Sequence, residues 1–187
     1  MKSVLISIQP KWCELIASGK KTIEVRKTIP KLLTPFKVYI YQTKESKRRF
    51  LDHRFNSAIK GITHHTEMGK VIGEFVCDKI DEFSVPYPAY FSEIDNNTKV
   101  IIENACLKPM DIHGYNGTRQ TYAWHISDLV IYDKPRKLSE FLKATKVFPT
   151  LIHDIAEEGN GSRYNKFYYP LKRPPQSWCY VESEDTQ

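Results

Sequence analysis

The sequence predicts an α+β fold of about five or six strands with a few short helices, in one domain spanning residues 1–187. Strands are expected where apolar residues alternate with polar ones, as in residues 3–9, 22–26 and 36–43. No strand–helix–strand rhythm runs along the chain, and no glycine-rich phosphate loop follows a strand. Both observations argue against a parallel, doubly wound sheet.

Residues 3–27 are predicted to form a strand, a short helix, a turn and a second strand. Pro10 suits the first turn of a helix, because its fixed φ is helical and its missing N–H is not needed there. Gly19 follows the last apolar residue of the helical stripe, where it can adopt the left-handed conformation that ends a helix.

The second of these strands carries a polar face. Alternation places Thr22, Glu24 and Arg26 on one side and apolar residues on the other. Lys20 and Lys21 come directly before this face. A hydroxyl, a carboxylate and three cations are therefore gathered in one short segment.

The remaining chain is predicted to alternate between strands, short helices and irregular segments. In the strand at 70–80, Val71, Phe75 and Cys77 are expected on one face, with Gly73 at a bulge or a close backbone approach. The other predictions are a helix from Asn96 or Asn97 to about Cys106 that Pro109 stops, a loop at 110–118, a strand at 121–133 ended by Pro135, a helical turn at 138–142, a final strand at 176–181, and peripheral insertions near 44–69 and 150–173.

Composition excludes several classes of protein. The chain has 187 residues, 41% of them hydrophobic and 27% charged, which is typical of a globular domain. No apolar run of about 18 residues and no signal peptide are present, so we expect a cytoplasmic protein without membrane contact. Four dispersed cysteines and one adjacent histidine pair do not match a metal site, and we expect no metal and no cofactor. The net charge of +6 is compatible with a polyanionic partner.

The first unit resembles the ASCH domain, a PUA-like small mixed β-barrel family associated with RNA and modified nucleosides. The segments Gly69–Asp78, Ala123–Asp133 and Pro174–Glu182 extend the resemblance toward phage and prophage members. Because these segments lie at both ends of the chain, the resemblance implies one barrel with short helices at its rim. The residues that carry it in the first unit are Ile8, Pro10, Trp12, Ile16, Gly19, Lys21, Thr22, Glu24 and Arg26.

The resemblance implies that the polar face lines a ligand cleft. There Glu24 would accept a hydrogen bond from an exocyclic amine, and Arg26 would donate to a carbonyl or a phosphate. Trp124 would either stack on a base or pack in the core. Spacing alone favours another interpretation, in which Glu24 and Arg26 form an ordinary surface ion pair. The predicted ligand-binding residues are Lys20, Lys21, Thr22, Glu24, Arg26 and Trp124.

The leading functional hypothesis is therefore a module that binds RNA or a modified nucleoside. The alternative is a hydrolase, because residues 19–26 are similar to the Gly-x-Lys-Thr-Ile-x-x-Arg segment of bacterial N4-acetylcytidine amidohydrolases. In that case Lys21 and Glu24 would be catalytic, although Glu24 stands where that family has its catalytic threonine. A ribonuclease and an interaction module without a ligand are the other candidates. The sequence indicates neither an oligomeric state nor a protein partner.

Overall fold

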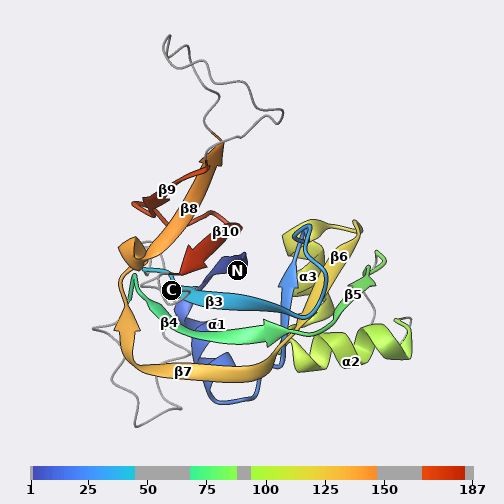
Figure 1. Cartoon of the computed structure of the whole chain (residues 1–187). Coiled ribbons are helices and arrows are strands. Elements are labelled where there is room, and N and C mark those ends of the chain that lie inside the picture. Colours follow the sequence, from blue (N-terminus) through green and yellow to red (C-terminus); the bar gives the residue numbers. More distant parts are fainter. Residues whose placement is uncertain (1, 45–67, 88–93, 147–165, 184–187) are drawn as a thin grey trace, which may run out of the picture.

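The computed structural model describes residues 2–44, 68–87, 94–146 and 166–183, and it contains two β-sheets with short helices beside them (Figure 1). This mixed architecture confirms the predicted α+β class. The larger sheet has the order β7 (Ser127–Arg136), β4 (Val71–Cys77), β3 (Phe36–Gln42), β1 (Ser3–Ile8), β10 (Trp178–Ser183), β8 (Phe141–Lys146) and β9 (Lys166–Pro170). The smaller sheet has the order β2 (Ile23–Arg26), β6 (Thr121–His125) and β5 (Ile80–Phe83). The helices are α1 (Pro10–Ala17), α2 (Asn96–Asn104) and α3 (Pro109–Asn116), with a 3-10 turn at Leu138–Glu140.

The first and last strands of the chain are neighbours. β1 pairs in parallel with β3 and antiparallel with β10, in a register that places Val4 opposite Tyr180. The two sheets are continuous along the chain, because β4 leads into β5 and β6 leads into β7. At the second junction the backbone N–H of Ile126 donates to the carbonyl of Thr22 at 2.9 Å, and Asp128 has a φ of 45°. The polypeptide therefore turns sharply where it passes from one sheet to the other.

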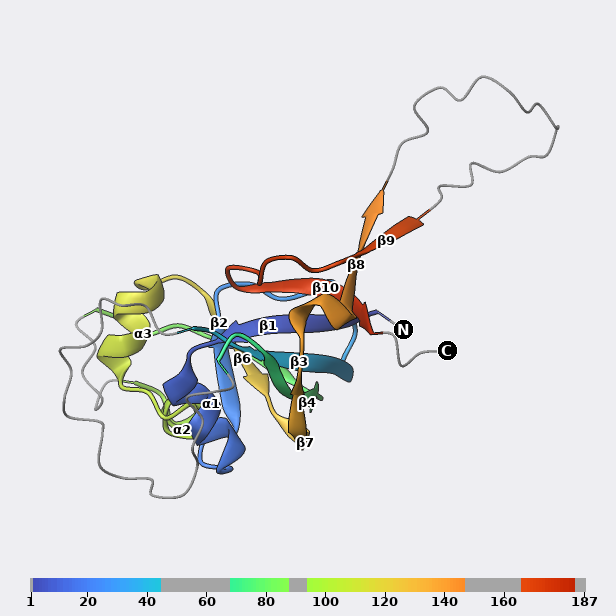
Figure 2. The same ribbon diagram turned by 90° about the vertical axis from the view of Figure 1, so that its left-hand side faces the viewer.

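Both faces of the smaller sheet are buried. On one face Ile23, Val25 and Ala123 pack against residues of α2 and α3, among them Ile101 and Ile112. Figure 2 shows these two helices at the end of the molecule opposite the β8–β9 ribbon. The other face looks into the main core, which contains Val4, Ile6, Phe75 and Trp124. None of the helices in the described ranges is long and apolar enough to cross a membrane.

Several local predictions are confirmed. Pro10 occupies the first turn of α1, and Gly19 has a φ of +71° just after that helix ends. Gly73 marks an irregular register between β4 and both of its neighbours. A Cβ atom added at Gly73 would lie 2.4 Å from the carbonyl oxygen of Val130, so a close backbone approach requires glycine here.

Other predictions are wrong around the helices. Residues 110–118 are largely helical in α3, and Pro109 starts that helix instead of only ending the preceding one. Asp111 at the third position accepts from the backbone N–H of Lys108 at 2.8 Å. The cap of α2 is Asp95, which accepts from the backbone N–H of Thr98 at 2.9 Å, and not Asn96 or Asn97.

The strand predictions also need correction. The predicted strand at 121–133 breaks at Ile126 and continues past Pro135 to Arg136. Val71 does not share a face with Phe75 and Cys77, because the irregularity at Gly73 sends it to a different core cluster. Strands β8 and β9 were not predicted, and β9 lies in the segment expected to be irregular. Most of the two predicted insertions, namely residues 45–67 of the first and 150–165 of the second, lies outside the described residues.

Candidate functional site

Three of the predicted site residues form one buried group of charges, which we call the buried ion triplet: Lys21, Glu24 and Arg26. Their exposed fractions are 3%, 7% and 7%. One carboxylate oxygen of Glu24 lies 2.9 Å from Nη2 of Arg26, and the other lies 3.4 Å from Nζ of Lys21. The polar face of β2 is therefore an interior face and not a surface strand.

Lys21 is held by the end of a helix. The turn at Gly19 brings the lysine back toward α1, whose Leu15 carbonyl accepts from the Lys21 backbone N–H at 3.0 Å. Its Nζ donates to the carbonyl of Ala105, the residue that ends α2, at 2.8 Å. A cation at this position satisfies a free carbonyl and interacts favourably with the negative end of the helix dipole. Lys21 therefore joins α2 to the smaller sheet.

Arg26 joins the two sheets. Its Nη2 donates to the carbonyl of Ser7 in β1 at 2.7 Å, and its Nη1 donates to the hydroxyl of Ser177 at 3.5 Å. A second bridge lies nearby in sequence, where the indole N–H of Trp178 donates to the hydroxyl of Thr28 at 3.0 Å. Side-chain hydrogen bonds thus connect β2 and the residues just after it with β1 and the start of β10.

Trp124 lies opposite Glu24 in the β2–β6 register, so the two side chains share a face. Its ring is fully buried and packs edge-on against Phe36, with ring centroids 5.8 Å apart, and lies 6.1 Å from the ring of Trp178. Among the residues that the structure describes, its indole N–H finds no hydrogen-bond partner, and neither does Nε of Arg26. Two buried donors on one sheet face are thus unsatisfied, which normally costs free energy.

Lys20 and Thr22 are not part of this group, because both are exposed. Their backbones nevertheless connect elements around it. The Lys20 carbonyl accepts from the thiol of Cys106 at 3.3 Å, and the Thr22 N–H donates to the carbonyl of Asn104 at 3.0 Å. The structure thus brings Lys21, Glu24, Arg26 and Trp124 together and leaves the other two predicted residues at the surface.

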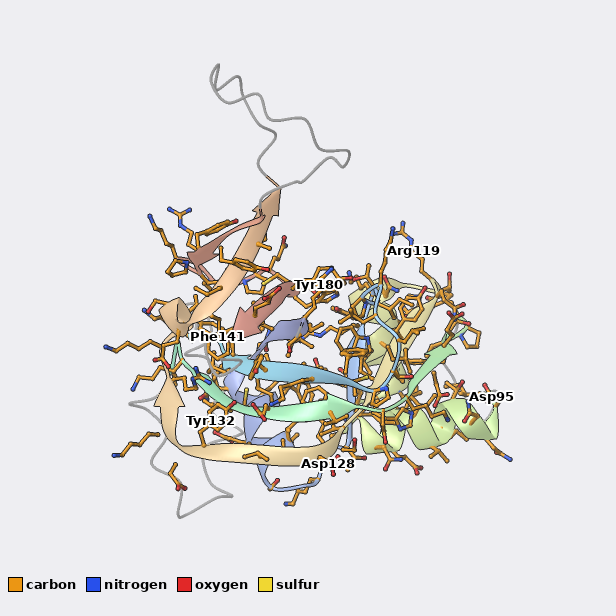
Figure 3. All side chains as sticks on the ribbon, viewed as in Figure 1. Asp95, Arg119, Asp128, Tyr132, Phe141 and Tyr180 are labelled. Atoms are coloured by element: carbon orange, nitrogen blue, oxygen red, sulfur yellow. The ribbon has the colours of Figure 1, made fainter. Side chains whose placement is uncertain are left out.

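A surface hollow of about 340 Å³ lies at the end of α3, and we call it the Tyr115 hollow. Nζ of Lys27 lies 4.5 Å from the centre of the Tyr115 ring, and Arg119 projects from the segment after α3 (Figure 3). Burial raises the pKa of Tyr115, and the charges of Arg26 and Glu24 also act on it, so the phenol is within electrostatic reach of the triplet. The lining consists of Lys27, Tyr115, Asn116, Gly117, Thr118 and Arg119.

Sequence reasoning missed this hollow because it predicted a loop where α3 stands. The signal was available, since Pro109 with Asp111 two residues later is a typical helix start.

As for metals, the described part of the chain contains no group of three or more His, Cys, Asp or Glu side chains that could hold one.

The family model of the ASCH domain matches residues 6–116, which is more than half of the chain. The protein therefore belongs to the ASCH domain family. The matched region includes the buried ion triplet and Tyr115, and it ends before Trp124 and the strands that follow.

Among solved structures, the chain is similar to ASCH from Zymomonas mobilis, with 23% identity over 73% of each chain and a TM-score of 0.48. Two mutants of that protein match with 23% and 24% identity, covering 74% and 73% of this chain and 77% and 74% of theirs, each with a TM-score of 0.48. No curated protein matches the sequence.

Proposed function

We propose that this protein binds RNA or a modified nucleoside, and that a nucleobase reaches the buried face formed by the triplet and Trp124 when the packing over that face opens. The observation that carries the proposal is the pair of buried, unsatisfied donors, Nε of Arg26 and Nε1 of Trp124. A ligand that presents acceptor oxygens on this face would remove the cost of leaving both donors unpaired. Carbonyl groups of pyrimidines and of acylated bases are such acceptors.

The charges of the triplet support the same class of ligand. In their ordinary ionised forms Lys21 and Arg26 carry two positive charges against the single negative charge of Glu24. The excess positive charge favours ligand carbonyls and phosphates over amines. Both oxygens of Glu24 are already paired, so contact with an exocyclic amine would depend on their remaining lone pairs.

The Tyr115 hollow supports binding of the rest of such a ligand. Lys27 and Arg119 would attract a phosphate, and the half-exposed Tyr115 ring would offer a stacking surface. The family membership favours a nucleic acid or nucleoside over other acceptor-rich molecules. An origin in a phage or prophage, which the sequence resemblance suggests, stays a prediction.

The test is titration of the full chain with cytidine, uridine, N4-acetylcytidine and short RNA at low salt, by calorimetry. We expect Tyr115→Ala to weaken binding about tenfold, because stacking contributes about 1–3 kcal/mol per base. The matched control is Tyr168→Ala, since Tyr168 is similarly exposed, at 43% against 40%, but lies on β9. If no nucleoside or RNA binds the folded protein, or if both variants bind like the wild type, the proposal is wrong.

A second candidate is hydrolysis of an acylated cytidine or of RNA by Lys21 and Glu24. The observation in its favour is their separation of 3.4 Å in a buried setting. Against it, Lys21 donates to the Ala105 carbonyl and pairs with Glu24, so its amine is already engaged in this conformation. Chromatography of N4-acetylcytidine and labelled RNA after incubation tests it. Product formed at the same rate by Lys21→Ala would exclude this site as the catalyst.

A further inference from the structure

Strands β8 and β9 form a two-stranded ribbon that leans away from the body of the molecule (Figures 1 and 2). They pair over five residue pairs, from Leu142 opposite Pro170 to Lys146 opposite Lys166. β9 is an edge strand of the larger sheet. The ribbon lies outside residues 6–116, so the family match does not account for it.

The charge of the ribbon, together with the three residues that follow β9, is of one sign. Residues 141–146 and 166–173 contain five lysines and arginines and no aspartate or glutamate. The whole chain has 28 basic and 22 acidic residues, so this segment departs strongly from the average. A protruding surface of this kind attracts polyanions.

The two faces of the ribbon differ. The register places Lys143 opposite Tyr169 on one face and Ala144 opposite Tyr168 on the other. The first face borders a hollow of about 430 Å³, and the Tyr169 ring there is 42% exposed. On the other face the Tyr168 hydroxyl donates to Glu182 at 3.1 Å. The hollow is lined by Lys143, Tyr169, Leu171, Lys172 and Arg173, which are three cations, one aromatic ring and one apolar side chain.

We propose that the Tyr169 face of this ribbon is a second binding surface, for single-stranded nucleic acid. A base would stack on Tyr169, and the flanking phosphates would contact Lys143, Lys172 and Arg173. An acidic peptide could match the charges, but it has no base that would use the exposed ring. The surface does not involve the triplet or the Tyr115 hollow, so it stands independently of the function proposed above.

The first experiment compares two neighbouring tyrosines in the full-length protein. Fluorescence anisotropy measures the affinity for a labelled oligouridylate of about twelve nucleotides and for the corresponding oligodeoxythymidylate. We expect Tyr169→Ala to weaken binding about tenfold and Tyr168→Ala to change it less than about twofold. Equal effects of the two substitutions, or no effect of Tyr169→Ala, would overturn the proposal.

The second experiment measures the salt dependence of the affinity. Each phosphate contact with a single strand contributes about 0.7 to the slope of log K against log salt concentration. Replacing Lys143, Lys172 and Arg173 together by alanine should therefore reduce the slope by about 2. For a matched control, Lys172→Ala alone is compared with Lys134→Ala, an exposed lysine on β7, and only the former should reduce the slope.

Other occupants of the surface give different results. Competition by polyglutamate as strong as that by unlabelled oligouridylate would show that charge alone is recognised. Self-association in sedimentation that Tyr169→Ala abolishes would show that a second copy covers the face. Either result overturns the proposal. Titration of the ribbon variants with free nucleosides distinguishes this surface from the nucleoside site proposed above. These variants should bind nucleosides like the wild type, whether or not the ribbon binds an oligonucleotide.

Discussion

Replacing Glu24 by glutamine should destabilise the fold, because Glu24 is the only anion of the buried ion triplet. The substitution keeps the size and one acceptor oxygen but leaves the charges of Lys21 and Arg26 uncompensated at 3% and 7% exposure. Breaking a buried ion pair costs about 3–5 kcal/mol. The lower end applies here, about 3 kcal/mol, because the amide oxygen can still accept from Arg26 and both cations keep backbone carbonyl partners.

A loss of this size should be measured easily. For a chain of this length 1 kcal/mol corresponds to about 2–4 °C, so the melting temperature should fall by about 6–12 °C. Urea unfolding followed by tryptophan fluorescence gives the free energy directly. The matched control is Glu14→Gln, which makes the same chemical change at an exposed position of α1 and should stay within about 0.5 kcal/mol.

A double variant checks the mechanism. If Glu24 stabilises the fold by compensating the charge of Lys21, the double variant Lys21→Met/Glu24→Gln should lose less unfolding free energy than the two single variants lose in sum. Equal stability of Glu24→Gln and Glu14→Gln would refute the reasoning. Loss of nucleoside affinity at unchanged stability would then assign Glu24 to recognition of the ligand.

Two further predictions concern the sheets and α3. Gly73→Ala should destabilise the fold by about 1–3 kcal/mol, because its Cβ would meet a backbone carbonyl of β7. Gly114→Ala inside α3 should instead stabilise the fold by about 0.5–1 kcal/mol, because its Cβ would meet nothing within 4 Å. Urea unfolding measures both free energies, and similar effects of the two substitutions would contradict the argument. Burial acts to raise the pKa of Asp81, but hydrogen bonds and charges from Lys79 and His125 outweigh it and hold that pKa below its ordinary value. A lowered folded-state pKa gives stability that is present above about pH 4 and is lost as the pH falls through the folded value. Asp81→Asn should therefore lose less stability than the wild type on acidification from pH 5 to pH 3, and parallel profiles would contradict this assignment.

Local chemistry explains which elements could be predicted from the sequence. Pro10 and Gly19 delimit α1 because each requires a particular φ, independent of the rest of the chain. α3 was missed because Pro109 both ends one helix and begins the next, and the composition of residues 110–118, with two glycines, resembles a loop. β9 was missed because it is an edge strand, paired on one side only among the described strands, and its sequence does not alternate between apolar and polar residues.

The candidate site shows a stricter limit on what can be predicted from the sequence. Alternation on β2 correctly separated Ile23 and Val25 from Glu24 and Arg26, but that pattern is the same for a surface strand and for a strand buried on both faces. What buries the polar face is long-range: β6 brings Trp124 opposite Glu24, and β1 brings its Ser7 carbonyl to Arg26. Contacts between residues far apart in sequence leave no local periodicity.

The same geometry changes how the charges should be interpreted. From the sequence alone, Glu24 is interpreted as the residue that selects the ligand, because it is the one acid in a segment of cations. In the structure its two oxygens are occupied by Lys21 and Arg26, and the groups on this face that lack a partner within the described part of the chain are N–H donors. Since an unsatisfied buried donor gains more from a new partner than a paired carboxylate does, recognition on this face should depend on acceptor oxygens of the ligand. Ligands should therefore be ranked by the carbonyls they present to Arg26 and Trp124, and the contribution of Glu24 is to hold Arg26 in place.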